Sequence, residues 1–365
     1  MKIGFVAEDF TSSNIDMLGR PIWSGPTWVR LAQYSDHLTE MGVAHRCGSL
    51  AFNKKWGIFG VCDLKGKIWF DCDVIVLQRY MDAEVKAEMR MAQALGQIFI
   101  NDVDDWYWGL SKKNAAYSAS DPRRNPLRNR NIYAEIISMS DGVIASTPFL
   151  YEKLSHWNSR TVLHGNYVDL KRFKKYWQHE DKEKIVVGWV GSTIHRSGDL
   201  DVLRPYVKDI SEFATWHHTG HIPYDGFPKF HDEIGISEND VTYYPFQNPQ
   251  SLMAGINFDV GIVPLVNIPF NHAKSYLKGI EYAAANVPFV ASWSPQYQTL
   301  ADEHGIGVVV SKASEYVTEL KKFSDFDYRK EMAEANRKAV QAFDTKLGAV
   351  HLYEHIKEIV RQVRP

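Results

Sequence analysis

Two lysines and a glutamate at regular intervals offer the most specific chemistry in the chain. Lys274, Lys278 and Glu281 fall on one face of an expected helix. The opposite, apolar stripe that faces a core is formed by Leu277, Ile280 and Ala284. Lysines four residues apart repel each other by about 0.2–0.5 kcal/mol on a bare helix. An anion at the helix start, where free N–H groups and the dipole favour negative charge, explains the pattern better. A solvated helix face is the alternative interpretation.

The surrounding segment resembles the nucleotide-sugar signature of retaining, family 4-like GT-B glycosyltransferases. The resemblance rests on Asn271-His-Ala-Lys-Ser-x-x-Lys-x-x-Glu-Tyr and on the following Pro288-x-Val-Ala-Ser. It implies that Glu281 holds the donor ribose, that Lys274 and Ser275 meet the diphosphate, and that transfer retains configuration without an essential metal. Two departures concern the sugar pocket, because Ala273 replaces a second glutamate and Asn286 replaces a glycine. The resemblance therefore supports nucleotide binding more than a particular sugar.

A strand that runs into a small-residue turn is the second candidate donor contact. In Val187-Gly-Trp-Val-Gly-Ser-Thr-Ile-His195 the glycine lets backbone N–H groups approach a diphosphate, and the hydroxyls of Ser192 and Thr193 add donors. The family opens its C-terminal domain with a similar Gly-x-x-Gly-Ser segment, here Gly188 to Ser192. His195 is a further phosphate or base contact. An ordinary glycine turn after a strand is the alternative.

The loop after the first strand is a candidate acceptor contact. The family places a glycine-rich loop here, which assigns Ser24 and Gly25 to acceptor binding. The dinucleotide fingerprint GxGxxG is missing after the first strand, and this argues against a nicotinamide dehydrogenase. A simple helix cap would also explain these residues.

Carboxylates and aromatic residues follow the strand that ends near Asn101. Asp104 and Asp105 are the candidate catalytic residues on the acceptor side, and Trp106 could stack on a sugar or base. A metal site of the Asp-x-Asp type suits a hard divalent cation. It is not expected here, because the nucleotide signature lies in the other half of the chain. A capped loop with a tucked tryptophan remains the structural alternative.

A basic segment, residues 111–131, suggests an acceptor that carries phosphates. Arg123 and Arg124 are its candidate contacts, and phage enzymes that glycosylate hydroxymethylated DNA bases use GT-B folds. DNA is therefore a possible acceptor, whereas a solvated loop is the alternative. The histidine cluster 217–221 is interpreted as a polar loop rather than a metal site.

Composition limits the class of protein. The 365 residues are 45% hydrophobic and 24% charged, with a net charge of −2, as in ordinary soluble proteins of two domains. Three cysteines without CxxC spacing indicate reduced thiols, and no apolar run is long enough to span a membrane. A cytoplasmic protein is expected, and the resemblance to phage enzymes leaves a virus-encoded protein in a host cytoplasm open.

Alternating strands and helices predict an α/β protein with the GT-B fold, two Rossmann-like parallel-sheet domains facing a central cleft. The predicted domains are 1–172, a linker at 173–184, 185–345, and a C-terminal helix at 346–365 that packs back on the first domain. Predicted helices include 26–41, 82–95, 128–138 and 148–157.

The expected function is transfer of a sugar from a nucleoside diphosphate, UDP above all, to a hydroxyl of DNA, a glycan or a protein. A UDP-sugar epimerase and a non-catalytic binding protein are the alternatives.

Overall fold

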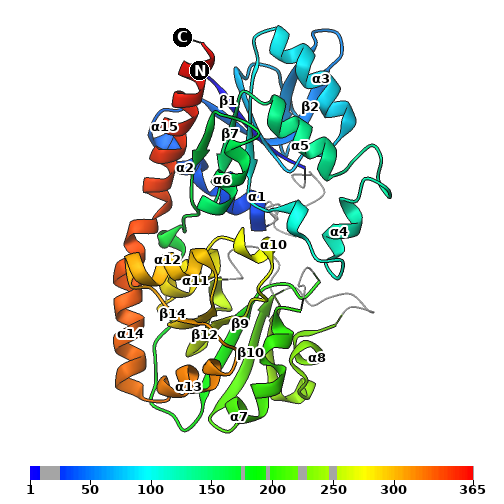
Figure 1. The fold of residues 1–365 in the computed structure, drawn as a ribbon. Helices are drawn as coiled ribbons and strands as arrows, with labels where there is room; N and C mark the ends of the chain where they lie inside the picture. Colours follow the sequence, from blue (N-terminus) through cyan, green and yellow to red (C-terminus); the bar gives the residue numbers. More distant parts are fainter. Residues whose placement is uncertain (9–24, 174–176, 195–197, 221–227, 246–252, 365) are drawn as a thin grey trace. The chain divides into compact units, whose positions relative to one another are not determined.

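The computed structural model describes residues 1–8, 25–173, 177–194, 198–220, 228–245 and 253–364 (Figure 1). The chain forms two compact units. The first unit contains residues 1–108, 118–167 and 345–365, and the second contains 109–117 and 168–344. Each unit has its own sheet and its own hydrophobic core.

An eight-stranded sheet, ordered β4-β3-β2-β1-β5-β6-β7-β8, forms the first unit. Its strands are β1 (Ile3–Ala7), β2 (His45–Asn53), β3 (Ile58–Cys62), β4 (Ile68–Trp69), β5 (Val74–Gln78), β6 (Ile98–Val103), β7 (Gly142–Ala145) and β8 (Thr161–Leu163). All neighbours pair in parallel except β2, β3 and β4, which form an antiparallel extension. The extension was not predicted, because glycines interrupt its apolar pattern. A Cβ atom at Gly60 would lie 2.3 Å from the carbonyl oxygen of Trp69, so this close strand approach requires glycine.

The helices of the first unit follow its strands. They are α1 (Gly25–Arg30), η1 (Ala32–Tyr34), α2 (Ser35–Glu40), α3 (Ala83–Ala94), α5 (Arg130–Met139), α6 (Pro148–Ser155) and α15 (Thr345–Val363). The short elements η2 (Tyr107–Gly109) and α4 (Ala115–Ala119) each contain residues of both units. The single helix predicted at 26–41 is wrong. Leu31 leaves the helical conformation, with φ −128° and ψ −59°, directly after the buried Arg30.

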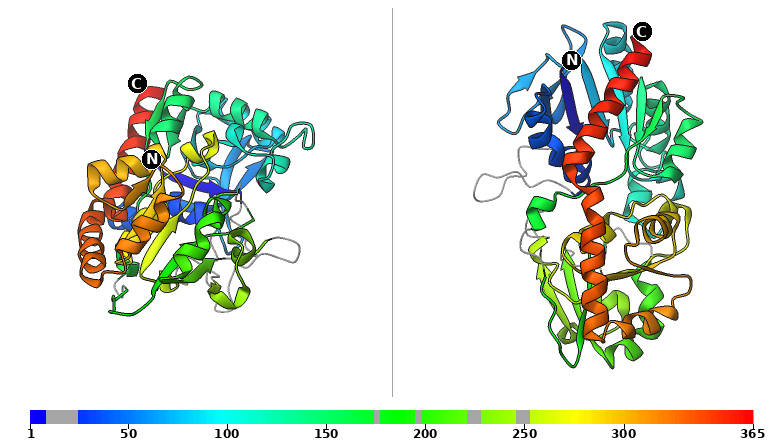
Figure 2. Two further views of the ribbon diagram at one scale, coloured as in Figure 1. Left: turned by 60° about the horizontal axis from the view of Figure 1, so that its bottom comes forward. Right: turned by 90° about the vertical axis from the view of Figure 1, so that its left-hand side faces the viewer.

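Successive side chains of each strand point to opposite faces of the sheet, so the core of the first unit has one part on each face. Phe5 and Val76 point to one face, where they meet Leu352 and Ile356 of α15. Figure 2 shows α15, in red, beside β1. On the other face, residues such as Val6, Ile75 and Phe99 pack against α3 and α5. Both faces of the parallel part are therefore buried, as parallel sheets require.

The second unit contains a six-stranded parallel sheet ordered β11-β10-β9-β12-β13-β14. The strands are β9 (Ile185–Val190), β10 (Ala214–Gly220), β11 (Val241–Pro245), β12 (Val260–Val263), β13 (Phe289–Ser292) and β14 (Val308–Val310). Its helices are η3 (Leu170–Phe173), η4 (Leu200–Tyr206), α7 (Val207–Ser211), α8 (Phe230–Ile234), η5 (Glu238–Asp240), α10 (Pro269–His272), α11 (Leu277–Ala284), α12 (Pro295–His304), α13 (Glu315–Lys322), α14 (Phe326–Ala339) and η6 (Val340–Phe343). Helices α12, α13 and α14 were not predicted.

The polar stretch 177–184, predicted as part of a linker, is attached to the second unit. The Trp177 N–H donates to the carbonyl of Ala285 at 3.0 Å, and Lys182 forms an ion pair with Asp259 at 2.8 Å. Asp259 is fully buried. Burial by itself would raise the pKa of its carboxyl, but hydrogen bonds from neighbouring groups and the charge of Lys182 lower this pKa to about 2. This carboxylate also accepts the N–H of Val186 at 2.7 Å, so it fastens the stretch to the start of β9.

Candidate functional site

The strand order of the second unit changes direction beside β9. Its neighbour β10 leads outward on one side, whereas β12, β13 and β14 follow on the other. In open α/β sheets, ligands bind where strand order reverses, outside the carboxyl ends of the strands. Here the segments that leave those ends are Gly191–Thr193 after β9 and the loop that begins at Pro264 after β12. Both carry residues that the sequence nominated.

Helix α11 is tied to both strands at this point by one hydroxyl group. The phenolic oxygen of Tyr282 accepts the N–H of Val190 at 3.0 Å and donates to the carbonyl of Ile262 at 3.3 Å. The Tyr282 side chain is fully buried. Lys278, one turn earlier, has its Nζ 5.6 Å from the ring centroid of Trp189 in β9. The predicted donor residues of α11 therefore lie at the carboxyl end of β9.

The start of the helix differs from the prediction. Helix α11 begins at Leu277, and Lys274 and Ser275 lie in the turn between α10 and α11. The two lysines are thus not on one helical face, and the repulsion argument does not apply to them. Lys274 Nζ instead lies 4.4 Å from the ring centroid of Phe270. The side chain of the N-cap residue Tyr276 does not cap α11, and Ser275 Oγ accepts the N–H of Leu277 at 3.4 Å; backbone N–H groups at such a helix start favour an anion.

The predicted apolar stripe of α11 does face a core, where Ile280 and Ala284 are fully buried and Leu277 packs against them, but the alternative of a solvated opposite face is wrong, because burial extends around most of the helix. Residues 279–284 are all buried, Glu281 among them at 9% exposure. Burial raises the pKa of the Glu281 carboxyl to about 7, and the charge of Lys278 opposes the rise. A partly protonated, buried carboxyl gains from hydrogen-bond donors that favour its ionised form. Ligand hydroxyl groups would supply such donors.

Asn286, at the position where the family carries glycine, has a left-handed backbone with φ 64°. Asparagine tolerates this conformation better than most residues with a side chain. Its side-chain Nδ2 donates to the carbonyl of Trp177 at 3.1 Å. The departure from the family pattern is therefore a local accommodation of the same turn.

A histidine of β10 fixes the turn after β9. His218 Nε2 donates to the carbonyl of Gly191 at 2.9 Å, and its ring forms a triangular cluster with the rings of Trp189 and Phe230, at centroid distances of 5.2 and 5.3 Å. Burial lowers the pKa of His218 to about 4, so the ring is neutral. The predicted polar loop at 217–221 is wrong for His217 and His218, which are buried strand residues; His221 lies outside the described residues.

The hydroxyl residues of the predicted donor set lie in this turn. Thr193 is 2% exposed, and its Oγ1 has no hydrogen-bond partner in the described part of the chain. Ser192 is partly exposed. His195 is outside the described residues. Gly191 has φ 152°, a conformation that side chains disfavour.

Sequence reasoning assigned no role to a buried pair that holds the loop after β12. Asp199 Oδ1 accepts Asn271 Nδ2 at 2.6 Å and the N–H of Val266 at 3.0 Å. Both side chains are at most 3% exposed. Asn271 belongs to the recognised motif, so the motif could have indicated that it needs a partner. The pair joins the segment after β9 to the segment that leads to Lys274.

A cluster of arginine and aspartate side chains lies near the carboxyl ends of β5 and β6 in the first unit. Arg79 donates through Nε and Nη2 to the two oxygens of Asp104, at 3.1 and 2.8 Å, and through Nη2 to Asp105 at 3.0 Å. Asp102 is buried with Arg30, whose Nη2 lies 2.6 Å from Asp102 Oδ1. The sequence analysis named Asp104 and Asp105 but missed both arginines.

The other acceptor residues predicted in the first unit are Trp106, Gly25 and Ser24. Trp106 is partly buried among Trp108, Phe149 and Trp157, with centroid distances of 4.7 to 6.2 Å. Gly25 is the first residue of α1, and a Cβ atom there would meet nothing within 4 Å. Ser24 lies outside the described residues.

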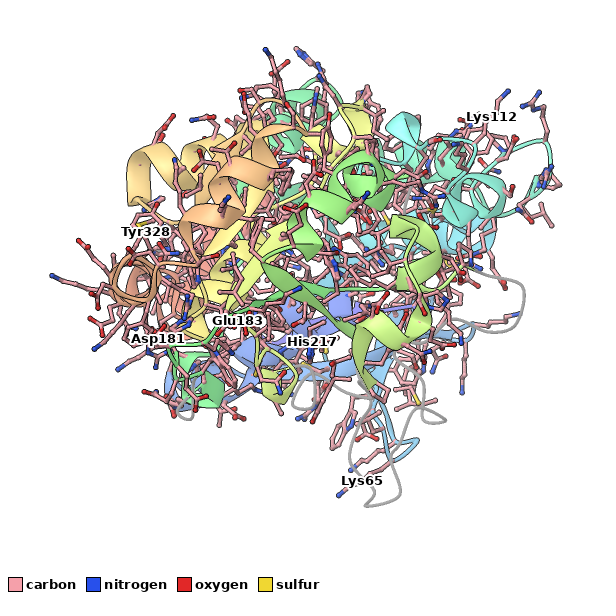
Figure 3. All side chains as sticks on the ribbon, turned by 90° about the horizontal axis from the view of Figure 1, so that it is seen from below. Lys65, Lys112, Asp181, Glu183, His217 and Tyr328 are labelled. Carbon is pink, nitrogen blue, oxygen red and sulfur yellow. The ribbon has the colours of Figure 1, made fainter. Side chains whose placement is uncertain are left out.

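The arginines of the basic segment 111–131 are engaged locally. Arg123 forms an ion pair with Asp121 at 3.3 Å, and Arg124 Nη1 donates to Ser118 at 3.1 Å. Arg128 forms an ion pair with Glu8. Lys112 is exposed and lies at the outer edge of the molecule in Figure 3. Ion pairs with Asp121 and Glu8 thus offset part of the charge of the segment, although the side chains of Arg123 and Arg128 remain 80% and 54% exposed.

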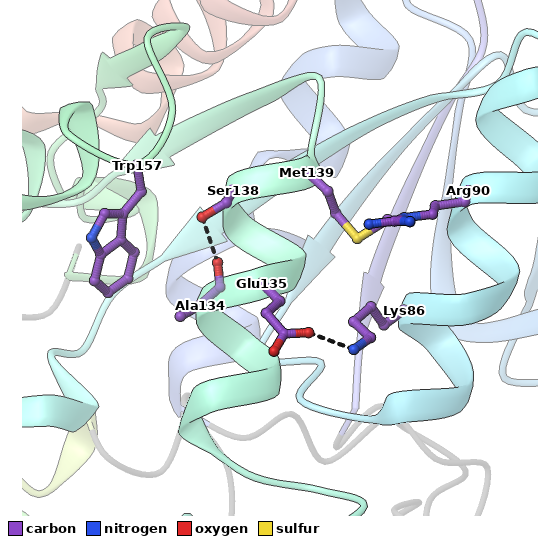
Figure 4. A pocket seen from close by; sticks show the side chains of 7 residues that line it. All are labelled: Lys86, Arg90, Ala134, Glu135, Ser138, Met139 and Trp157. Atoms are coloured by element: carbon purple, nitrogen blue, oxygen red, sulfur yellow. Dashed lines mark hydrogen bonds and ion pairs between the residues drawn. The ribbon is translucent and has the colours of Figure 1, made fainter.

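Two hollows lie at other places in the units. One of about 580 Å³ lies over α3 and α5 and is lined by Lys86, Arg90, Ala134, Glu135, Ser138, Met139 and Trp157 (Figure 4). An ion pair between Lys86 and Glu135 crosses it. The other, of about 230 Å³, lies at the carboxyl ends of β12, β13 and β14. Neither includes Glu281 or Asp104 in its lining.

Within the described residues, no group of three His, Cys, Asp or Glu side chains could hold a metal ion. Across the same residues, no helix is long and apolar enough to cross a membrane.

Comparison with solved structures identifies glycosyltransferases with the same architecture. Sucrose-phosphate synthase from Thermosynechococcus elongatus has a TM-score of 0.68 at 15% identity, covering 99% of this chain and 100% of the other. HepE of Anabaena, in complex with UDP and glucose, has a TM-score of 0.61 at 12% identity, covering 98% and 99%. A glycosyltransferase from Rickettsia africae ESF-5 has a TM-score of 0.57 at 13% identity, covering 98% of each chain. The sequence matches no protein-family model and no curated protein. The predicted GT-B fold class, with two Rossmann-like parallel-sheet units, is confirmed.

Replacing Tyr282 with phenylalanine is predicted to weaken the second unit. The change leaves the buried N–H of Val190 without its acceptor, and the free energy of unfolding should fall by about 1–3 kcal/mol. Urea denaturation of the whole chain measures this difference. Tyr328→Phe is the matched control and should change stability by less than about 0.5 kcal/mol. Equal stability of Tyr282→Phe and wild type would show that the bridge does not hold α11.

Proposed function

We propose that the chain is a retaining, metal-independent glycosyltransferase that takes a sugar from a UDP-sugar and transfers it to an acceptor hydroxyl. The observation that carries this proposal is the position of α11. Its Tyr282 bridge holds Lys278 and Glu281 at the carboxyl end of β9, where strand order reverses. The motif resemblance and the structural similarity to HepE, which was solved with UDP and glucose, support the same assignment.

In the proposed donor site, Glu281 accepts hydrogen bonds from the ribose hydroxyls. Lys274 and Lys278, with Ser275 and the turn at Gly191–Thr193, surround the diphosphate. During transfer the bond between the anomeric carbon and the diphosphate oxygen breaks, and negative charge builds on the leaving phosphate. Fixed cations stabilise that charge and lower the barrier. The acceptor oxygen bonds to the anomeric carbon, and its proton passes to the leaving phosphate.

We place the acceptor with Asp104 and Asp105 of the first unit and propose a glycan or protein hydroxyl. Local partners of Arg123, Arg124 and Arg128 argue against a surface shaped for DNA phosphates. A UDP-sugar epimerase remains the enzymatic alternative, because it would use the same nucleotide contacts without a separate acceptor.

Incubation with a panel of nucleotide sugars tests the activity. Each donor is presented alone, with an oligosaccharide mixture, or with hydroxymethylated DNA, and the products are analysed by mass spectrometry. We expect a hexose or pentose mass increment on a saccharide and only slow UDP release without acceptor. Conversion of a UDP-sugar to its epimer without acceptor would establish the alternative enzyme. A mass increment on DNA would contradict the proposed acceptor.

Binding of UDP-glucose should depend on pH through Glu281. Its pKa of about 7 in the free protein means that a ribose-binding carboxylate must lose a proton, so affinity should rise about tenfold from pH 6 to pH 8. Calorimetric titration of wild type, Glu281→Gln and the exposed control Glu303→Gln measures this. Glu281→Gln should bind more weakly at pH 8 and lose the pH dependence. A pH-dependent Glu281→Gln variant would exclude the ribose role.

A further inference from the structure

Arg79 occupies the place in the first unit where strand order reverses. Strand β1 has β2 on one side and β5 on the other, and Arg79 directly follows the last residue of β5. Asp104 and Asp105 follow the end of β6, the next strand in the sheet. The carboxyl ends of these strands form the side of the sheet on which ligands bind.

The backbone of Arg79 is in a conformation that few residues with a side chain adopt. Its φ is 63°, and among the described residues only Asn286 shares a positive φ without being glycine. Asparagine tolerates this region, whereas an arginine has no intrinsic preference for it. Such a conformation persists where the surroundings determine it, and these positions are concentrated at functional sites.

The guanidinium fork of Arg79 determines the geometry of both carboxylates. Asp104 receives two parallel N–H bonds at 3.1 and 2.8 Å, and Asp105 receives a third at 3.0 Å. The three side chains are 25%, 13% and 23% exposed, so the group is shielded from water but open to a ligand. Only arginine offers a planar fork of this kind, since lysine provides a point charge. The oxygens of the Asp104 carboxylate each have room for a further donor.

Burial and neighbouring charges act on Asp104 in opposite directions. The pKa of the Asp104 carboxyl is raised: burial raises it most, the charge of Arg79 lowers it, and the charge of Asp105 raises it again. The charged and titratable groups that interact with Asp104 are Arg79, Asp105, Asp102, Arg30, Tyr107 and Tyr133. Arg79 is the largest of the influences that lower this pKa.

We propose that Arg79 is a positioning residue of the acceptor site, where its fork holds Asp104 and Asp105 side by side as a paired receptor for the hydroxyl groups of the acceptor. The inference rests on the proposed glycosyltransferase function. Two adjacent carboxylates without the cation would share a proton, because like charges oppose joint ionisation. A protonated pair loses the acceptor capacity that orients an attacking hydroxyl. The acceptor group is then a neutral polyol such as a saccharide rather than a phosphate, which the carboxylates would repel.

Three variants separate this role from a purely structural one. Arg79→Asn removes the cation and tolerates the left-handed backbone, and Arg79→Lys keeps the charge but loses the fork. Lys86→Asn removes a cation that also pairs with a carboxylate, Glu135, outside the site. UDP release from UDP-glucose in the presence of the oligosaccharide mixture is measured from pH 5 to 9, UDP binding is measured by calorimetry, and circular dichroism checks folding.

Arg79→Asn should lower the rate at pH 7 at least about tenfold and move the acid limb of the pH profile upward by about one pH unit or more. Arg79→Lys should have its acid limb at the wild-type pH, with a rate between those of Arg79→Asn and wild type. This variant serves as the test if Arg79→Asn does not fold. Lys86→Asn should match wild type, and all variants should bind UDP equally.

A wild-type acid limb in Arg79→Asn, or equal losses in both Arg79 variants at every pH, would overturn the role of Arg79 while leaving the proposed function intact. A wild-type protein that neither binds UDP nor releases it from UDP-glucose would overturn the proposed function, and the role of Arg79 with it.

Discussion

The hydroxyl of Tyr282 is the interaction on which the candidate donor site depends. It joins α11 to β9 through the N–H of Val190 and to β12 through the carbonyl of Ile262. These two strands flank the point where strand order reverses, so one buried oxygen fixes the helix at the place where open α/β sheets in general bind ligands. Lys278 and Glu281 acquire their surroundings from this attachment. Their positions follow from the packing of the helix, because most of its circumference is buried.

The two units place charges of opposite sign at corresponding ends of their sheets. In the second unit the segment before α11 carries Lys274, and the first turn of α11 carries Lys278. In the first unit Asp104 and Asp105 follow β6, and Arg79 compensates them. Cations suit a diphosphate, whereas compensated carboxylates suit hydroxyl groups. The same architecture thus provides two chemically distinct candidate sites, one in each unit.

The sequence predicted the fold class and most parallel strands, because buried strands are continuous apolar runs between turn residues. It did not predict β2–β4, where glycines such as Gly60 interrupt the pattern for reasons of strand approach. The start of α11 was also misplaced, because the helix begins at Leu277 and not before Lys274. The spacing of the residues does not distinguish the conformations of these two positions.

For the candidate sites, the resemblance identified Glu281 and its neighbours, but their partners depend on contacts distant in sequence. Tyr282 was part of the recognised motif, yet its bond to Val190 spans 92 residues. Arg79 and Asp104 are 25 residues apart and belong to different strand ends. The rule on strand ends could have nominated Arg79, because it follows β5 directly. The burial that raises the pKa of Glu281 has no signal in its neighbours along the chain.

Hydrogen–deuterium exchange with and without UDP tests the central claim most directly, that the nucleotide site lies at the strand-order reversal of the second unit. Saturating UDP should slow amide exchange in residues 190–193 and 274–282, and peptides from the first-unit sheet should exchange as before. No protection in either segment, or protection confined to residues 98–105, would contradict the account.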